Sequence, residues 1–359
     1  MESSCRVSQY LRFHDPRIFS RFQVSRCRKI FSKPLSTTRQ RKKKQLLLHN
    51  TITSIGIPLQ DSVSCRSFQE NERVLPCEGS SPVTGGIVAL GKFEALHIGH
   101  RELAIQASKA GTPFLLSFIG MAEVFGWEQR SPIVAKCDRK RVLSSWAPYC
   151  GNVVPVEFHL EFSRVRHLSP QQFVERLSKE LKVSGVVAGE NYRFGYKAAG
   201  DASDLVRLCK EHGLGAYIVT SVMDKHQCPS DRTSEGDNPR ERGQVSSTRV
   251  RHALAEGDMK YVSELLGRKY RLVLAMNGGC VVVEKRMSAP KSCMLNQQPR
   301  EGLYENCTLL IDEVLVGPCR TIIDATHIHI ELSCEDAQVW APFWDSQLIG
   351  IEFGYFGEA

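Results

Sequence analysis

The sequence predicts an α/β fold, a doubly wound parallel sheet followed by a small β-rich C-terminal domain. Three observations support this prediction. From residue 85 onward, continuous runs of Val, Ile and Leu alternate with amphipathic segments, which is the pattern of a parallel sheet covered by helices on both faces. The preceding residues are basic and polar, whereas short β-like runs follow residue 270. We therefore expect three parts, at residues 1–80, 81–270 and 271–359.

Apolar runs and helix caps place the elements of the second part. Strands are expected at residues 87–90, 114–118, 153–158, 183–188 and 216–222. Helices are expected at residues 103–110, 138–146, 170–181, 202–212, 252–256 and 259–266. Ser169 suits an N-cap and Pro170 the first helical position, while Gly111 and Gly213 suit helix ends. Strand and helix alternate as a parallel sheet requires.

The remaining segments are a long polar stretch and the β-like tail. Residues 223–244 predict a disordered loop or a mobile flap, because structureless connections of this length are uncommon inside a domain. The tail is expected to form strands at residues 272–276, 280–283, 308–311, 328–332 and 348–353. We find no internal repeat, Walker A motif or GxGxxG motif.

The formal net charge of +8 comes from the N-terminus alone. Residues 1–44 hold 13 Lys and Arg against Glu2 and Asp15, a net +11, so the remainder carries −3. This segment is rich in Ser and Thr and has no long apolar run, which is typical of an organelle transit peptide. Its Ser/Thr content favours the chloroplast, with the mitochondrion as the alternative. The basic run at residues 39–44 alternatively suits a nuclear address or a nucleic-acid-binding arm.

Cysteine usage and hydropathy indicate the class of protein. The 13 cysteines are odd in number and include no C-x-x-C pair, which argues against a disulfide framework or a zinc ribbon and for reduced thiols. No apolar stretch approaches the length of a membrane span, so we expect a protein without membrane or nucleic-acid partners once the N-terminus is removed.

A pair of histidines follows the first predicted strand. The segment from Gly91 through Phe93 ends in His97-Ile98-Gly99-His100, directly before a predicted helix. Backbone N–H groups and the positive end of a helix dipole attract phosphate there, and imidazoles donate hydrogen bonds to phosphate oxygens. A histidine pair taken alone is more often a surface or metal-related feature.

Two later constellations are also suited to a nucleotide. One is Gly189-Glu190-Asn191-Tyr192-Arg193-Phe194-Gly195, where an amide suits a ring edge or ribose, aromatic rings suit stacking and Arg193 suits phosphate. The other is Ser246-Ser247-Thr248-Arg249-Val250-Arg251, where hydroxyls precede a helix and Arg251 is placed to hold a phosphate. The plain alternatives are an ordinary glycine-rich loop and simple N-caps.

Together, the order H-x-G-H, G-E-N-Y-R-F-G and S-S-T-x-x-R resembles the adenylyltransferase module of prokaryotic-type FAD synthetases. The resemblance covers about residues 86–270 and includes plant plastid forms. It implies adenylyl transfer from ATP to FMN with Mg²⁺, giving FAD and pyrophosphate. The same resemblance implies the site residues. Catalysis falls to His97, His100 and Arg251. ATP phosphates would be bound by Gly91, Phe93, His97, His100, Ser247, Thr248 and Arg251, and flavin by Asn191, Tyr192, Arg193 and Phe194. The magnesium ligands stay unassigned.

The chain departs from the family pattern at three places. The family's G-N-F-D-G is replaced by Gly-Lys-Phe-Glu-Ala, so Ala95 stands where glycine is usual and is expected to crowd the phosphate or to require another backbone angle. The Phe-x-Pro-His-Pro element is replaced at residues 118–125. The tail echoes the family's riboflavin kinase module at residues 299–304 and 326–331 but lacks its Pro-Thr-Ala-Asn signature, which predicts a degenerate module without kinase activity.

Three other functions are compatible with parts of the sequence. The same fold suits a nucleotidyltransferase with another acceptor, such as NMN or phosphopantetheine. The departures at Ala95 and at residues 118–125 suit a catalytically inactive flavin-binding protein. The basic N-terminus suits a nucleic-acid binder, whose affinity would decrease steeply with salt.

Overall fold

The computed structural model describes residues 82–224, 243–276, 279–283, 285–332 and 347–354. The chain divides into two units, residues 1–60 and 61–359, and all the described residues belong to the second. The expected transit peptide and most of the polar stretch at 223–244 lie outside the described residues.

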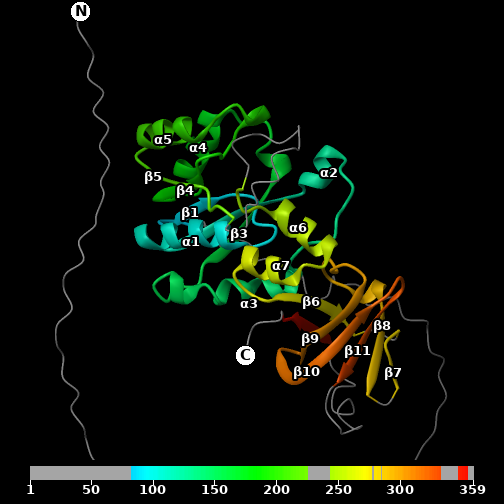
Figure 1. Cartoon of the computed structure of the whole chain (residues 1–359). Helices are drawn as coiled ribbons and strands as arrows, with labels where there is room; N and C mark the ends of the chain where they lie inside the picture. The colour runs from blue at the N-terminus through cyan, green and yellow to red at the C-terminus, as the bar shows by residue number, and fades with distance from the viewer. Residues whose placement is uncertain (1–81, 225–242, 277–278, 284, 333–346, 355–359) are drawn as a thin grey trace, which may run out of the picture. The chain divides into compact units, whose positions relative to one another are not determined.

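A five-stranded parallel sheet forms the first half of the described chain and confirms the predicted fold class (Figure 1). Its strands are β1 (Ile87–Leu90), β2 (Pro113–Ile119), β3 (Val156–Glu161), β4 (Gly185–Gly189) and β5 (Gly215–Val219). They lie in the order β3-β2-β1-β4-β5, so β1 is central and β4 is its neighbour. The carboxyl ends of β1 and β4, which precede two of the predicted constellations, therefore lie side by side.

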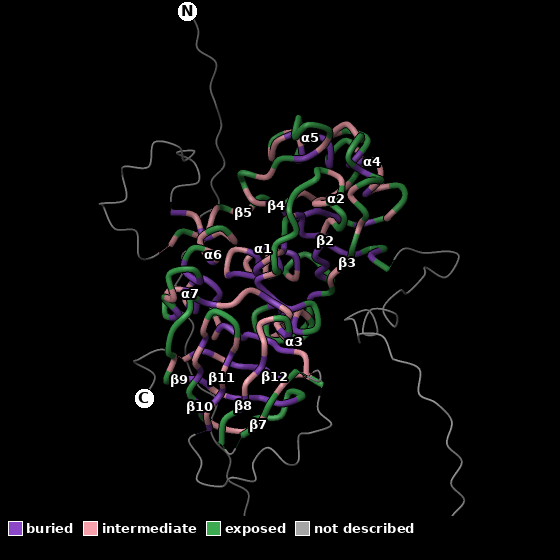
Figure 2. Tube along the Cα trace, turned by 90° about the vertical axis from the view of Figure 1, so that its right-hand side faces the viewer, coloured by how far each residue is buried: buried purple, intermediate pink, exposed green. Residues whose placement is uncertain are grey.

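Hydrophobic side chains cover both faces of this sheet. In β1, Ile87 and Ala89 join one buried cluster with side chains of α1, whereas Val88 and Leu90 join another with α4 and α5. The central strands β1 and β4 are buried, the edge strands β3 and β5 are partly exposed, and the outward faces of α4 and α5 are exposed (Figure 2). This alternation within one strand is what helices on both faces require.

Six of the seven helices correspond to expected ones, with differences at several ends, and α2 was not expected. They are α1 (Ile98–Ala110), α2 (Met121–Phe125), α3 (Arg139–Ser144), α4 (Pro170–Lys179), α5 (Ala202–Glu211), α6 (Ser247–Glu256) and α7 (Met259–Leu266). The helix expected at 252–256 begins five residues earlier because Ser246 is its N-cap. The Ser246 hydroxyl accepts a hydrogen bond from the Arg249 backbone N–H at 3.3 Å. The helix expected at 138–146 ends at Ser144, and Pro148 lies in the 3₁₀ turn that follows.

A seven-stranded antiparallel sheet follows α7 (Figure 1). Its strands, in the order β6-β12-β9-β10-β11-β8-β7, are β6 (Tyr270–Ala275), β12 (Leu348–Phe353), β9 (Gly302–Ile311), β10 (Val314–Ile323), β11 (His327–Leu332), β8 (Arg286–Pro290) and β7 (Val281–Val283). The sequence prediction missed β8, β10 and the first half of β9. Gly317 and Pro318 concealed β10, where the register shifts between Leu315 and Gly317.

One hydrophobic cluster joins the two sheets. It runs from α1 through α6 and α7 into the second sheet, where Tyr270, Leu272 and Leu274 are buried. Among the described residues, no helix is long and apolar enough to cross a membrane.

Candidate active site

The two histidines lie at the start of α1, just beyond the carboxyl end of β1. His97 is the N-cap of α1, and its Nδ1 accepts from the His100 amide at 3.3 Å. A Cβ atom at Gly99 would lie 3.1 Å from the His97 ring, so the absence of a side chain at Gly99 leaves room for that ring. Because Nδ1 accepts a hydrogen bond, the proton of a neutral His97 lies on Nε2.

Burial keeps both imidazoles neutral at physiological pH. Their rings stack with centroids 3.6 Å apart, and Phe93 packs edge-on against His100. Burial, followed by the nearby charge of Arg268, lowers the pKa of His97 to about 4. Burial, with smaller contributions from His97 and two arginines, lowers the pKa of His100 well below its usual range. His100 Nδ1 is buried and has no hydrogen-bond partner among the described residues, so it remains available to a ligand.

Two arginines fix the loop between β1 and α1. Arg139 donates to the carbonyl oxygens of Phe93, at 2.6 Å, and Glu94, at 3.3 Å. Arg268 donates to those of Leu96, at 2.6 Å, and Ala95, at 3.0 Å. Four successive carbonyls are therefore occupied by cationic donors. The sequence prediction included neither arginine, since nothing local in the sequence marks a side chain that binds a distant backbone.

Ala95 fits the loop without left-handed backbone strain. Its side chain is fully buried, and it is not among the described residues with positive φ, whereas Leu96 is, at φ 49°. The positive φ angle, which glycine adopts most readily, thus occurs at Leu96, one residue after Ala95. Gly91 precedes the loop, and a Cβ there would meet the Phe93 ring at 3.2 Å.

Contacts between loops bring the three predicted constellations together. Asn191 Nδ2 donates to Ser221 Oγ at 3.3 Å and to Gln244 Oε1 at 3.2 Å, just before α6. The next residue, Val245, has its carbonyl oxygen 3.9 Å from where a Cβ of Gly99 would lie. The loop after β4, the segment before α6 and the start of α1 therefore adjoin one another.

The other residues predicted to contact flavin are engaged within their own loop. The rings of Tyr192 and Phe194 stack with centroids 6.0 Å apart. Phe194 is only 5% exposed and belongs to the hydrophobic cluster that also contains side chains of α4 and α5. Arg193 is exposed and donates twice to the Ala198 carbonyl, at 2.9 and 3.1 Å. These contacts shape the loop around Asn191, and the roles of the three residues in flavin binding stay predictions.

The start of α6 presents hydroxyls and holds Arg251. Ser247 is half-buried and Thr248 is exposed, both in the first turn, where helix N–H groups lack intrahelical partners. Arg251 pairs with Glu94 of the β1–α1 loop, donates to Gln297 Oε1 and donates to the Ser131 carbonyl at 3.0 Å. The predicted phosphate ligand is thus anchored by other parts of the chain.

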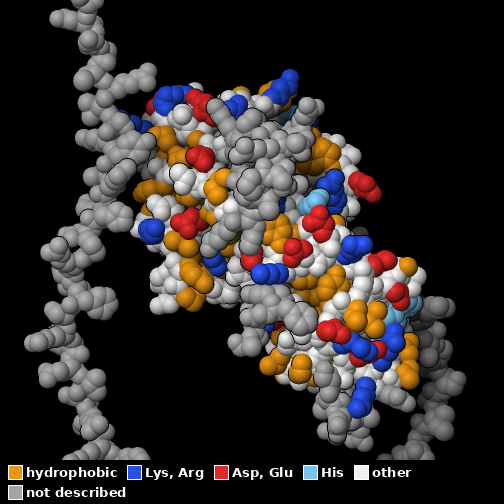
Figure 3. Space-filling view, in the orientation of Figure 1, with side chains coloured by type: hydrophobic (Ala, Val, Ile, Leu, Met, Phe, Trp, Pro, Cys, Tyr) orange, Lys and Arg blue, Asp and Glu red, His pale blue; other side chains and the backbone are white. Residues whose placement is uncertain are grey.

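An aromatic surface lies beside this loop and was missed from the sequence. The segment at 118–125 ends β2 and forms α2, after which Phe125 and Trp127 stack at 4.7 Å with about half of each side chain exposed. Lys92 Nζ lies 5.8 Å from the Trp127 ring. Hydrophobic side chains gather on the surface near α2 (Figure 3).

The described residues contain no group of three or more His, Cys, Asp or Glu side chains suited to a metal ion. The oxygens available at the start of α6 are hydroxyls, whereas the Glu94 carboxylate is paired with Arg251. Such a donor set fits an ion that takes most of its ligands from a substrate's phosphates, as Mg²⁺ does.

Comparisons with known proteins agree on one family. A family model described as FAD synthetase matches residues 81–233, and one described as FAD synthetase 1/2, C-terminal domain, matches residues 269–356. The chain is 52% identical over 342 residues to "FAD synthetase 1, chloroplastic" of Arabidopsis thaliana, covering 95% of this chain and 96% of the relative. It is 58% identical over 304 residues to "FAD synthetase 2, chloroplastic" of the same plant, covering 84% and 81%.

More distant similarities extend to bacteria. A "Bifunctional riboflavin kinase/FMN adenylyltransferase" of Listeria monocytogenes is 30% identical over 192 residues, which is 51% of this chain and 54% of the relative. A crystal structure described as a macrolide-efflux protein from Streptococcus pneumoniae superposes with a TM-score of 0.54 at 21% identity, covering 75% of this chain and 92% of that one. This structural likeness concerns the fold alone.

Proposed function

Because this chain belongs to the FAD synthetase family, we propose that it transfers AMP from ATP to FMN, giving FAD and pyrophosphate. A phosphate oxygen of FMN bonds to the α-phosphorus of ATP, and the bond from that phosphorus to the β-phosphate bridge oxygen breaks. The observation that best supports the proposal is the meeting of the Asn191 loop, the segment before α6 and the start of α1.

The β1–α1 loop and α1 are proposed to stabilise charge on the triphosphate. Neutral His97 keeps its proton on Nε2, and this N–H would donate to a phosphate oxygen as charge moves toward the leaving pyrophosphate. His100 supplies a second imidazole whose Nδ1 lacks a partner among the described residues. Because the ring positions are fixed by the helix cap and by stacking, the donors need little rearrangement during the reaction.

Ser247, Thr248 and Arg251 are proposed to bind the remaining phosphate oxygens. The first-turn N–H groups of α6 and the two hydroxyls are suited to an anion, and Arg251 adds a cationic donor. Mg²⁺, when bound, would neutralise phosphate charge, and the hydroxyls of Ser247 and Thr248 are the protein oxygens we assign to its coordination.

The flavin is proposed to lie between the Asn191 loop and the aromatic surface at α2. Asn191 offers an amide to a ring edge or ribose, and the exposed faces of Phe125 and Trp127 are suited to stacking with a planar ring. The aromatic surface adjoins the β1–α1 loop through Lys92, and the Asn191 loop adjoins it through the segment at Val245 and the start of α1.

Two further properties are proposed for the whole chain. We place the enzyme in the chloroplast, in agreement with the chloroplastic relatives and with the composition of residues 1–44. We also propose that residues 271–359 form a degenerate riboflavin kinase-like domain without kinase activity, since the chain lacks the Pro-Thr-Ala-Asn sequence.

Product analysis with separated acceptors tests these proposals. The purified chain is incubated with ATP and Mg²⁺ and with FMN, riboflavin, NMN or phosphopantetheine, and the products are resolved by chromatography. We expect FAD and pyrophosphate in equal amounts from FMN and no product from the other three acceptors. FMN formed from riboflavin would contradict the absence of kinase activity, and turnover of NMN or phosphopantetheine without FAD would favour the other acceptors. Tight FMN binding without turnover would indicate a flavin-binding protein.

A further inference from the structure

Arg251 is held from two directions. One terminal nitrogen, Nη2, binds Glu94 of the β1–α1 loop and the Ser131 carbonyl, and the other, Nη1, binds Gln297. Glu94 and Gln297 are 203 residues apart and belong to different halves of the described chain. The Arg251 side chain is 17% exposed, so few other acceptors compete for it.

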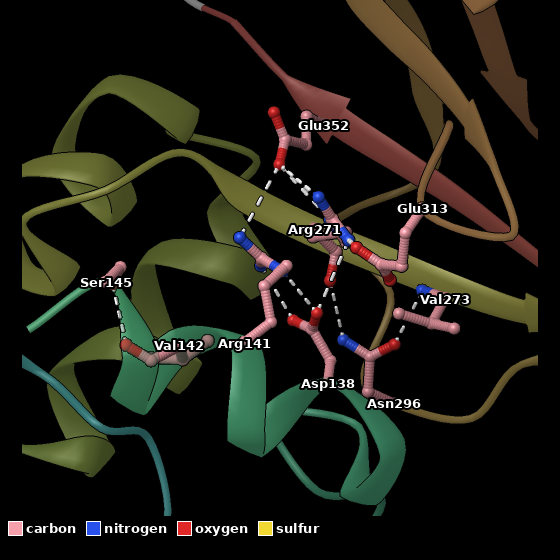
Figure 4. A network of polar contacts seen from close by, with 9 residues as sticks. All are labelled: Asp138, Arg141, Val142, Ser145, Arg271, Val273, Asn296, Glu313 and Glu352. Atoms are coloured by element: carbon pink, nitrogen blue, oxygen red, sulfur yellow. Dashed lines mark hydrogen bonds and ion pairs between the residues drawn. The ribbon is translucent and has the colours of Figure 1, made fainter. Parts of the chain in front are cut away.

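Gln297 is itself firmly placed. Its backbone N–H donates to the Pro132 carbonyl at 2.8 Å, and its backbone carbonyl accepts a hydrogen bond from the buried hydroxyl of Tyr270. The side chain of Asn296 accepts from the Val273 amide at 2.8 Å and donates to the Arg271 carbonyl at 2.9 Å (Figure 4). Gln297 therefore presents its side-chain oxygen from a segment attached both to β6 and to the residues before α3.

The same segment contacts α6 at a second point. The Arg300 amide donates to the Leu254 carbonyl at 2.8 Å, one helical turn beyond Arg251. At Gly257, which ends α6, a Cβ would meet the Tyr304 hydroxyl at 3.1 Å. Residues 296–304 thus run along α6. The direction of the Arg251 side chain depends on α6, which carries it, and on this segment, which binds it.

We infer that the C-terminal sheet region contributes to adenylyl transfer through Gln297, a positioning residue that fixes the guanidinium of Arg251 for the phosphates of ATP. The inference rests on the proposed function and deepens it. Gln297 accepts from Nη1 of Arg251, and Glu94 accepts from Nη2, which leaves the Nε–H and the second Nη1–H for the phosphates. In this inference Gln297 acts through Arg251 and not by contact with substrate. The β-rich domain is then needed for adenylyl transfer whether or not it has an activity of its own.

Substitution at position 297 tests the inference, with a neighbouring glutamine as the matched control. Gln297→Ala removes the acceptor, Gln297→Glu retains an acceptor oxygen, and Gln298→Ala shortens a side chain whose oxygen has no partner among the described residues. We expect Gln297→Ala to lower kcat/KM for ATP roughly tenfold with KM for FMN unchanged. Gln298→Ala should remain within about twofold of the unsubstituted chain. Gln297→Glu keeps the acceptor but adds a negative charge beside the proposed phosphate site, so its kcat/KM should lie between those of Gln297→Ala and the unsubstituted chain.

A double-substitution cycle separates positioning from a general structural effect. If Gln297 acts through Arg251, Gln297→Ala causes no further loss in an Arg251→Ala background. A loss of the same size in both backgrounds would overturn the inference, as would tighter binding of ATP to Gln297→Ala.

The inference and the proposed function can fail separately. FAD formation by the unsubstituted chain with unaltered kinetics in Gln297→Ala would refute only the inference. If the unsubstituted chain forms no FAD, the proposed function fails. The dissociation constant of ATP, measured by calorimetry on the same variants, still tests whether Gln297 positions Arg251, because that readout needs no turnover. Weaker ATP binding in Gln297→Ala but not in Gln298→Ala would support the inference, and equal binding would overturn it.

Discussion

At the scale of single residues, His97 combines two roles that depend on its being neutral. Its Nδ1 caps α1 by accepting from the His100 amide, which a doubly protonated ring cannot do. Burial, followed by the charge of Arg268, lowers its pKa to about 4. The cap and the phosphate-donor role thus require the same tautomer.

The pKa of His97 predicts how stability changes with pH. In the unfolded chain the imidazole binds a proton below about pH 6.5, whereas in the folded chain it does so only near pH 4. The unfolded state therefore gains protons first, and stability decreases as the pH falls from about 6.5 toward 4. His97→Asn keeps a capping side chain and should remove about 2 kcal/mol of the loss between pH 7.5 and pH 5.

Urea unfolding at both pH values measures this contribution. His100 should still contribute a pH-dependent loss in the His97→Asn variant, because its pKa is also lowered. His252→Asn, which removes a histidine whose side chain is 76% exposed, provides the control for the loss of an imidazole from the surface. An unaltered pH dependence in His97→Asn would show that His97 titrates normally in the folded chain.

Ala95 gives a second prediction at this scale. Its backbone does not require glycine and its methyl group is fully buried, so Ala95→Gly should destabilise the chain by about 1 kcal/mol. If the methyl group does not crowd the phosphate, the substitution should leave kcat and KM for ATP unchanged. Chemical unfolding and steady-state kinetics check both, and a rise in kcat would indicate that the methyl group obstructs ATP.

At the scale of elements, the β1–α1 loop depends on arginines from elsewhere in the chain. Arg268 is the second residue after α7 and binds two successive carbonyls with one nitrogen each, at 2.6 and 3.0 Å. A lysine has a single ammonium group and does not reproduce this forked geometry. Arg268→Lys should therefore lower kcat/KM for ATP by at least about tenfold.

An exposed arginine provides the comparison for Arg268. Arg164 pairs with Glu161 on the surface, where its side chain is 68% exposed, so Arg164→Lys should have little effect on rate or stability. Steady-state kinetics on the two variants check the difference. Equal rates in both would mean that the loop keeps its conformation without Arg268.

Elements were predictable where their signals are local. Ser169 and Pro170 mark the start of α4 in the sequence, and the capping box is present in the structure. The start of α6 was placed too late because Ser246, Ser247 and Thr248 are all suitable caps and their pattern does not identify the first helical residue. In the second sheet, Gly317 and Pro318 resemble a break, yet they lie within β10.

The candidate site was predictable to the same extent. His97, His100 and Arg251 stand in short motifs and were predicted from the sequence, and their catalytic roles stay predictions. Arg139, Arg268 and Gln297 were not, because each acts on atoms more than 40 positions away, and two of them bind backbone carbonyls that have no signature in the sequence. Tertiary packing determines these contacts, which a pattern along the chain does not contain.

At the scale of the molecule, a buried charge network connects the parallel sheet region with the antiparallel sheet (Figure 4). Arg271 of β6 is 5% exposed and binds Asp138, at 3.4 Å, and Glu352 of β12, at 2.8 Å. Asp138 also binds Arg141 of α3 at 2.5 Å. Because the hydrophobic cluster also runs through both halves, we expect the described parts to unfold in one transition.

This network predicts unequal effects for two acidic residues that contact the same arginine. The Asp138 side chain is 6% exposed, and Asp138→Asn removes a buried carboxylate that Arg271 and Arg141 share. Arg271 retains Glu352 and Glu313, so stability should fall by about 2 kcal/mol. Glu313 binds Arg271 at 2.7 Å but is 60% exposed, so Glu313→Gln should cost less than about 1 kcal/mol. Thermal unfolding, followed by far-ultraviolet circular dichroism and Trp fluorescence, measures both. Two separate transitions in Asp138→Asn would mean that the network, rather than the shared hydrophobic cluster, couples the halves, whereas one transition at a lower midpoint is the result that a continuous core requires.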